Sequence, residues 1–116
     1  MTSLILEIGP VRLQAELAEN SIAAAILNAL PISERCQRWG EEIYFPIPVD
    51  MANDGGQDVV ELGDLAYWPP GKALCIFFGP TPASHGDEPR AASAVTVVGK
   101  IVGDLLPLFQ VQSGSE

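Results

Sequence analysis

The chain has 116 residues, 47% of them hydrophobic, and a formal net charge of −9 with a pI of about 4.3. Its length predicts a single domain that can bury an apolar core, and the acidic balance disfavours nucleic acid and anionic membranes as partners, because the net field repels phosphate. No apolar run approaches the roughly 20 residues that span a bilayer, and residues 1–3 lack the basic region of a signal peptide. The two cysteines, Cys36 and Cys75, lack C-x-x-C spacing. We therefore expect a cytoplasmic protein with reduced thiols.

Residues 4–17 predict a β-hairpin. Leu4–Ile8 and Val11–Leu17 each alternate apolar with polar side chains, which is typical of a strand that is buried on one face. The Gly-Pro pair at 9–10 stands between the two segments and favours a tight turn. We therefore expect one face of this hairpin to pack on the core and the other to face water.

The next segment, Ser21–Leu30, predicts the one convincing helix of the chain. Its apolar residues recur along one stripe, and its run of three alanines favours helix strongly. Either Asn20 or Ser21 can cap it, since either side chain can accept a hydrogen bond from an unpaired backbone amide. Pro31 is expected to end it, because the residue before a proline is pushed out of the helical region.

The remainder of the chain predicts short strands separated by Gly- and Pro-rich turns. Residues 53–58 and 79–93 are expected to be polar loops. A parallel α/β fold is excluded because each parallel crossover needs a connecting helix of its own. The pattern indicates a small, mainly β barrel or sandwich. Its expected strands are Cys36–Trp39, Glu42–Ile47, Leu65–Trp68, Ala73–Phe78, Ala94–Val102 and Phe109–Gln112.

The polar motifs do not specify a reaction. Asp50–Glu61 carries acidic residues at several positions of a calcium-binding loop, but Ala52 stands where an oxygen ligand is required, so no metal is expected. Glu41 and Glu42 are adjacent in a strand and point to opposite faces, so they cannot flank one scissile bond. His85 is the only histidine and lies in a polar loop. No phosphate-binding glycine motif occurs, and no cofactor is expected.

The aromatic residues gather beside turns and prolines at the ends of the expected strands. Taken singly, each one is favoured as a core residue, with Phe45 and Phe78 as the first candidates. Taken together, they resemble the lining of an apolar groove, because Trp and Tyr favour boundaries where the polar tip finds a partner. The residues of this set are Trp39, Tyr44, Tyr67, Trp68, Phe77 and Phe78.

Three segments resemble the small prokaryotic cyclophilin-like domains, a family of minimal cyclophilin-fold proteins. They read RWGEEIYFPIPV at 38–49, GDLAYWPPGKALCIFFGPTP at 63–82 and GDEPRAASAVTVVGKIVGDL at 86–105. The resemblance implies a mainly β protein whose closed eight-stranded barrel carries a single covering helix. It covers nearly the whole chain, so we expect one domain over residues 1–112. The tail at 113–116 is expected to be frayed, because the last residues of a domain are poorly ordered unless they are tied down.

The resemblance carries less information about activity. Cyclophilins isomerise X–Pro bonds with the arginine of a Phe-His-Arg strand motif beside an aromatic proline pocket. The corresponding stretch here, Ile43–Pro46, contains neither His nor Arg. Cys75–Phe78 is similar to the Gln-Phe-Phe strand of cyclophilins but lacks the glutamine. No catalytic residue is therefore assigned, although Arg38 or Arg90 could reach the cleft from another element.

The favoured interpretation is a domain that binds a small ligand or a proline-containing peptide in an aromatic-lined groove, without an assigned reaction. The alternatives are a weak or diverged peptidyl-prolyl isomerase, and a structural or adaptor protein that acts through a homodimer or a partner surface. Exposed aromatics would favour the adaptor, whereas a shaped groove would favour binding. The expected ligand-binding residues are Arg38, Glu42, Tyr44, Tyr67, Trp68, Phe78, Thr81 and His85.

Overall fold

The computed structural model describes residues 2–8, 11–32, 34–53 and 55–111. Over these residues the protein is mainly β, with one α-helix and two short 3-10 segments, η1 (Pro69–Gly71) and η2 (Leu106–Gln110). The helix and strands are β1 (Thr2–Ile8), β2 (Val11–Leu17), α1 (Ser21–Ala29), β3 (Gln37–Arg38), β4 (Glu42–Pro46), β5 (Gln57–Val59), β6 (Asp64–Trp68), β7 (Ala73–Phe77) and β8 (Arg90–Val102).

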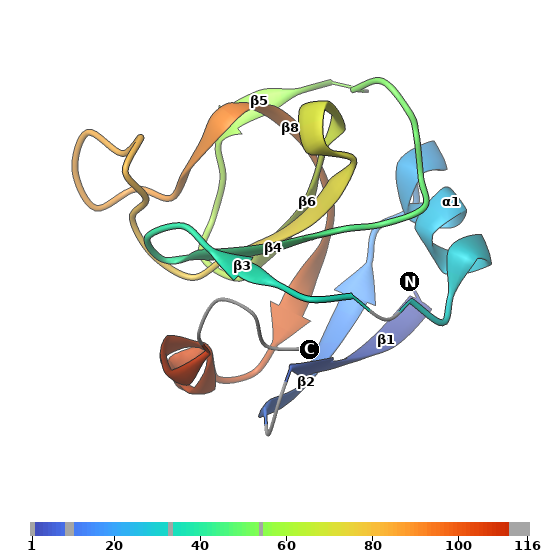
Figure 1. Cartoon of the computed structure of the whole chain (residues 1–116), viewed down its shortest axis with the longest axis horizontal. Coiled ribbons are helices and arrows are strands. Elements are labelled where there is room, and N and C mark those ends of the chain that lie inside the picture. Colours follow the sequence, from blue (N-terminus) through green and yellow to red (C-terminus); the bar gives the residue numbers. More distant parts are fainter. Residues whose placement is uncertain (1, 9–10, 33, 54, 112–116) are drawn as a thin grey trace.

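The strands form an antiparallel sheet that is organised around β8. The order is β1-β2-β8-β6-β7-β4-β3, and β5 pairs with β8 outside this path. Figure 1 shows the strands curving around a common centre, with α1 at one flank beside the β1–β2 hairpin. The pairings place β1 and β3 at the two ends of the order and do not join them, so full closure of the barrel stays a prediction.

The structure confirms the predicted hairpin and the predicted helix. In β2, Val11, Leu13, Ala15 and Leu17 are buried and alternate with more exposed residues. The turn expected at 9–10 lies outside the described residues. The Asn20 side chain caps α1 by accepting from the amide of Ala23 at 2.8 Å.

The helix ends at Ala29, one residue earlier than expected. Leu30 already has extended backbone angles (φ −69°, ψ 149°), because it precedes Pro31. The Asn20 side chain also donates to the carbonyl of Val97 in β8 at 3.1 Å, which fixes the start of the helix to the sheet. No helix in the described ranges is both long and apolar enough to cross a membrane.

The sheet has apolar residues on both faces, and each face has its own cluster. The larger cluster lies under α1 and receives Ile22 and Ile26 of the helix, both fully buried. The smaller cluster lies on the opposite face, since alternate residues of a strand point to opposite sides. Its buried members are Val60, Ala66, Cys75, Phe77, Ala91 and Val95, with Tyr44, Trp68 and Val97 packed against them.

Two strand predictions need correction around β5 and β8. The expected loop at 53–58 contributes to β5, whose three exposed residues pair with β8 through the main chain. The same pairing starts β8 at Arg90 instead of Ala94. A side-chain pattern carries no signal for such pairing, because exposed edge residues need not be apolar.

The expected last strand at Phe109–Gln112 is wrong for the residues described. Leu106–Gln110 forms a 3-10 turn that has a proline within its first two positions, where proline favours helical geometry. Leu108 and Val111 are buried in the larger cluster. The apolar residues at these two positions therefore belong to a turn that packs on the core and not to a strand. Gln112 and the tail at 113–116 lie outside the described residues. The strand expected at Cys36–Trp39 shrinks to Gln37–Arg38.

Gly99 marks the point at which β8 passes from one neighbour to another. It pairs with Leu17 of β2 and with Leu65 of β6, next to an irregularity in the β6–β8 register. A β-carbon at Gly99 would collide with the main-chain oxygen of Glu16 and lie 3.2 Å from the Cα of Leu17. The close approach of the two backbones therefore requires a residue without a side chain.

We predict that Gly99→Ala lowers the free energy of unfolding by about 1–3 kcal/mol, because main-chain atoms must move to admit the methyl group. Urea unfolding followed by circular dichroism measures this change. Gly86→Ala is the matched control, since the added β-carbon would meet nothing nearer than Glu88 Oε1 at 3.5 Å. Equal stability of the two variants would contradict this role of Gly99.

Candidate functional site

A pocket of about 240 Å³ opens on the sheet face opposite α1. We call it the aromatic pocket. It collects side chains from β4, β6, β7 and β8 and from the turn before β4. Both tryptophans of the chain line it. Its lining residues are Trp39, Glu42, Tyr44, Trp68, Cys75, Ala91, Ala92 and Val95.

Strand register brings these side chains to one face. Tyr44 of β4 lies opposite Cys75 of β7, and Cys75 lies opposite Ala66 of β6. Because side chains alternate along a strand, Glu42 and Tyr44 share this face, and Trp68 shares it with Ala66. The pocket is therefore a direct product of the β4–β7–β6 pairing.

The turn before β4 positions Trp39 beside Glu42. The amide of Trp39 donates to the Glu42 carbonyl at 2.8 Å, and the amide of Glu42 donates to the Trp39 carbonyl at 3.1 Å. Gly40 sits inside this turn with φ +61°, and a β-carbon there would lie 2.8 Å from Pro82 Cδ. Both the backbone angle and the close approach of the 80–82 segment favour glycine at this position.

The indole of Trp68 is held at the pocket by its polar end. Its Nε1–H donates to the Ser93 hydroxyl at 2.7 Å, in the first half of β8. The ring remains half-buried and packs against the smaller apolar cluster. One end of the indole is thus satisfied, while its apolar body faces the pocket.

Glu42 is the charged group of the aromatic pocket. It is 6% exposed, and burial raises the pKa of its carboxyl from 4.5 to about 7, although a hydrogen bond from the Cys75 thiol opposes this shift. The pKa of Cys75 is also raised, first by burial and then by the neighbouring Glu42 charge. Near neutral pH, Glu42 can therefore donate or accept a hydrogen bond, whereas Cys75 stays a thiol and is a poor nucleophile.

Of the eight expected ligand-binding residues, Glu42, Tyr44 and Trp68 meet in this pocket. Arg38 and Phe78 meet each other elsewhere. The Arg38 guanidinium lies 5.2 Å from the centre of the Phe78 ring and donates to the carbonyls of Phe109 and Val111 at 3.0 and 3.1 Å. These contacts tie η2 to the sheet.

Tyr67, Thr81 and His85 are placed apart from the pocket. Tyr67 is fully buried on the helix-covered face, where its hydroxyl donates to the Val49 carbonyl. The Thr81 hydroxyl donates to the carbonyl of Arg90. His85 is exposed in the 79–89 loop, and its backbone amide donates to Glu88 at 2.8 Å.

Five lining residues were absent from the sequence-based set. Trp39 belonged to the aromatic set that was expected to line a groove, but it was not among the eight expected ligand-binding residues. Cys75 was expected only to be a reduced thiol. Alternation along β7 could have placed Cys75 on the Tyr44 face only with the register known. Nothing in the sequence distinguishes the small residues that complete the pocket, namely Ala91, Ala92 and Val95.

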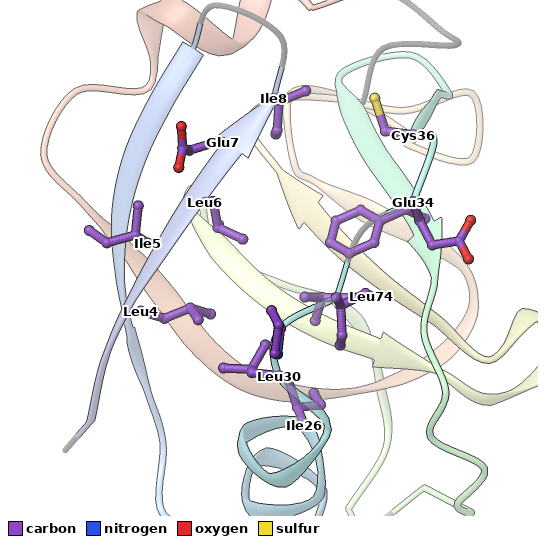
Figure 2. Close-up of a pocket in the computed structure, with 13 residues that line it drawn as sticks. Leu4, Ile5, Leu6, Glu7, Ile8, Ile26, Leu30, Glu34, Cys36 and Leu74 are labelled. Atoms are coloured by element: carbon purple, nitrogen blue, oxygen red, sulfur yellow. The ribbon is translucent and has the colours of Figure 1, made fainter.

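A second and larger cavity, of about 570 Å³, contains none of the expected ligand-binding residues. We call it the edge cavity because it lies along β1, at one end of the strand order (Figure 2). Its other walls come from Ile26 of α1 and from Leu30, Pro31, Ile32, Glu34, Cys36, Phe45 and Leu74. The aromatic pocket remains the candidate functional site, since a titratable group and both tryptophans converge there.

The fold and the aromatic pocket define a mainly antiparallel β protein with one covering helix and a pocket on the opposite face. The chain belongs to the cyclophilin-like family, whose model matches residues 2–116. It is similar to the hypothetical protein AF2241 from Archaeoglobus fulgidus, known from a solution structure. The two share 42% identity and a TM-score of 0.81, over 97% of this chain and 89% of the other. The comparison with curated proteins found no match.

We predict that Glu42 makes the protein less stable as the pH rises. The folded-state pKa, about 7, lies above the ordinary value of 4.5. The contribution of protonated Glu42 to the free energy of unfolding is therefore complete below about pH 4.5 and is lost as the pH rises through about 7. The total loss of stability is on the order of 3 kcal/mol.

Urea unfolding at pH 5 and at pH 8 measures this effect. Glu42→Gln is expected to reduce the difference between the two pH values, because glutamine has the shape of the acid without its titration. Glu41→Gln is the matched control, since the neighbouring carboxyl does not line the pocket. An unchanged pH dependence in Glu42→Gln would contradict the buried position of the acid.

Proposed function

We propose that the protein is a binding module whose aromatic pocket takes one apolar group of a short peptide or small ligand. The observation that carries this proposal is the convergence of Trp39, Tyr44 and Trp68 around a nearly buried carboxyl. Aromatic walls supply apolar contact, and the carboxyl supplies one oriented hydrogen bond. This combination is typical of ligand sites.

The size and charge of the pocket restrict the ligand. Its volume of about 240 Å³ is below the range of about 300–1,000 Å³ that holds a whole drug-sized molecule, so it suits one ring or side chain, such as proline. No Lys or Arg is among the lining residues described. We therefore expect a ligand without negative charge, whose apolar group fills the pocket while a neighbouring N–H donates a hydrogen bond to Glu42.

Two further parts of the proposal concern the closure of the sheet and the location of the protein. We propose that the sheet curls into the barrel of that family, with the edge cavity left at the seam between β1 and β3; the TM-score of 0.81 to the archaeal protein supports the barrel. We also propose a cytoplasmic location. The free thiol of the buried Cys75 supports a reducing compartment.

A weak isomerase is the second candidate, and the position of the cations counts against it. Twisting an X–Pro amide is helped by a fixed cation near its nitrogen, which is electrostatic stabilisation of the transition state. Arg38 is held on Phe78 and the η2 carbonyls, while Arg90 pairs with Glu88 at 3.0 Å. A role as a structural or adaptor protein is also less favoured. Trp39 and Trp68 are half-buried in a pocket, whereas an adaptor surface would present them as an exposed patch.

We predict that a proline-containing tetrapeptide changes the intrinsic tryptophan fluorescence, since Trp39 and Trp68 both line the aromatic pocket. Tyr44→Ala should weaken this binding at least tenfold, because it removes one wall. Tyr67→Phe is the matched control, since that ring is buried on the opposite face. A panel of short peptides and small amines that leaves the fluorescence unchanged would contradict the proposed binding function.

In a protease-coupled assay on a proline tetrapeptide, we expect little or no acceleration of isomerisation. Arg38→Ala and Arg90→Ala test the two arginines nearest to a catalytic role. If the protein accelerated the reaction as strongly as ordinary cyclophilins, and either substitution abolished it, the isomerase would replace the binding module. Binding without acceleration would support a site that lacks this chemistry.

A further inference from the structure

The edge cavity has a wall made of main chain. Five consecutive residues of β1, Leu4–Ile8, line it. Neighbouring side chains of a strand point to opposite faces, so a single face cannot supply all five. Figure 2 shows Leu4 and Leu6 pointing toward Leu74, whereas Ile5 and Glu7 point to the other side of β1. The cavity therefore runs along the edge of the strand.

This edge carries hydrogen-bonding capacity that the described sheet does not use. β1 pairs only with β2 in the strand pairings of the described residues. In an antiparallel pair, alternate residues turn their N–H and C=O groups away from the partner strand. One row of donors and acceptors of β1 therefore faces the cavity.

The volume of the cavity matches a short extended peptide. One residue of a strand within a sheet occupies roughly 160 Å³, from a rise of about 3.4 Å, a strand spacing of about 4.8 Å and a sheet spacing of about 10 Å. The cavity of about 570 Å³ thus holds about three to four such residues. The lining segment Leu4–Ile8 spans about 14 Å, which agrees with this number.

The chemistry of the remaining walls selects the side chains of that peptide. Leu4, Leu6 and Leu74 offer an apolar floor for residues that point inward. On the outer side, Glu7 offers a carboxylate next to the position of an added strand, and Glu34 also lines the cavity. No lining residue described is basic, and the chain carries a net charge of −9. Opposite charges across neighbouring strands are favourable, so outward lysines or arginines fit this edge.

We propose that the edge cavity binds an extended peptide that adds a strand to β1, with apolar side chains inward and basic side chains outward. An alkyl ligand fits less well, because it would remove water from the edge amides without replacing their hydrogen bonds. A second copy of this acidic chain fits less well, because its charge opposes association and the space admits about one strand. This site is separate from the aromatic pocket.

The test uses the full chain and a fluorescein-labelled peptide of sequence Lys-Val-Lys-Val-Lys, followed by fluorescence anisotropy. Leu6→Trp, which fills the cavity, is expected to weaken binding at least tenfold, and Leu62→Trp, an exposed site outside it, is the control. Glu7→Lys is expected to weaken binding more than Asp58→Lys, which makes the same change of net charge elsewhere. Circular dichroism checks that each variant folds.

Two peptide analogues keep the test independent of protein folding. One is N-methylated at both valines and the other at the lysines, so each loses the donors of one peptide edge. Strand addition predicts at least a tenfold loss for one of them, and equal binding of all three peptides would overturn the proposal.

Two other results would also overturn it. The first is quenching of Trp39 and Trp68 by the unlabelled peptide, since both lie in the aromatic pocket. The second is a dimer that Leu6→Trp dissociates, because the edge would then belong to a second copy. If the proposal for one site is contradicted, the proposal for the other can still be tested. Tryptophan fluorescence reports on the aromatic pocket, whereas peptide anisotropy reports on the edge cavity.

Discussion

The pairing of β8 with three other strands is the constraint on which the rest of the structure depends. This strand of 13 residues holds β2 at its end, β6 in its middle and β5 near its start. It thereby joins the N-terminal hairpin to the remainder of the sheet. Two main chains can approach closely enough at the crossing because position 99 is glycine. The α1 helix depends on the same strand, since its capping residue Asn20 also bonds to β8.

The division of the sheet into two faces explains why adjacent residues have different roles. Tyr67 and Trp68 are neighbours in β6, yet Tyr67 is fully buried under α1 and Trp68 lines the aromatic pocket. Glu42 follows the same rule, because it shares a face with the half-buried Tyr44 and is itself buried. Burial then changes its chemistry by raising its pKa toward neutrality. The character of the pocket is thus a consequence of strand alternation and pairing.

The two cavities differ in the kind of recognition that they favour. The aromatic pocket offers side chains and one carboxyl, so the binding function that we propose would distinguish a single group by shape and by hydrogen bonding. The edge cavity has a main-chain wall, so the strand addition that we propose would recognise an extended backbone more than any one side chain. Membership of the cyclophilin-like family places these features on a known scaffold, and the archaeal relative is itself described as hypothetical. Function therefore has to be argued from the sites.

The sequence by itself determined the mainly β character, the hairpin, the helix with its cap and the family, because periodicity, capping and long motifs are local signals. It also named three residues that line the aromatic pocket, Tyr44 and Trp68 because aromatic polar tips favour boundaries, and Glu42 because it alternates onto the Tyr44 face. Only the tertiary structure decided that Arg38 supports η2, that Cys75 joins the pocket and that β5 is a strand. These outcomes depend on strand register and on main-chain pairing between residues far apart in the chain. Register and main-chain pairing produce no recognisable pattern in the amino-acid sequence.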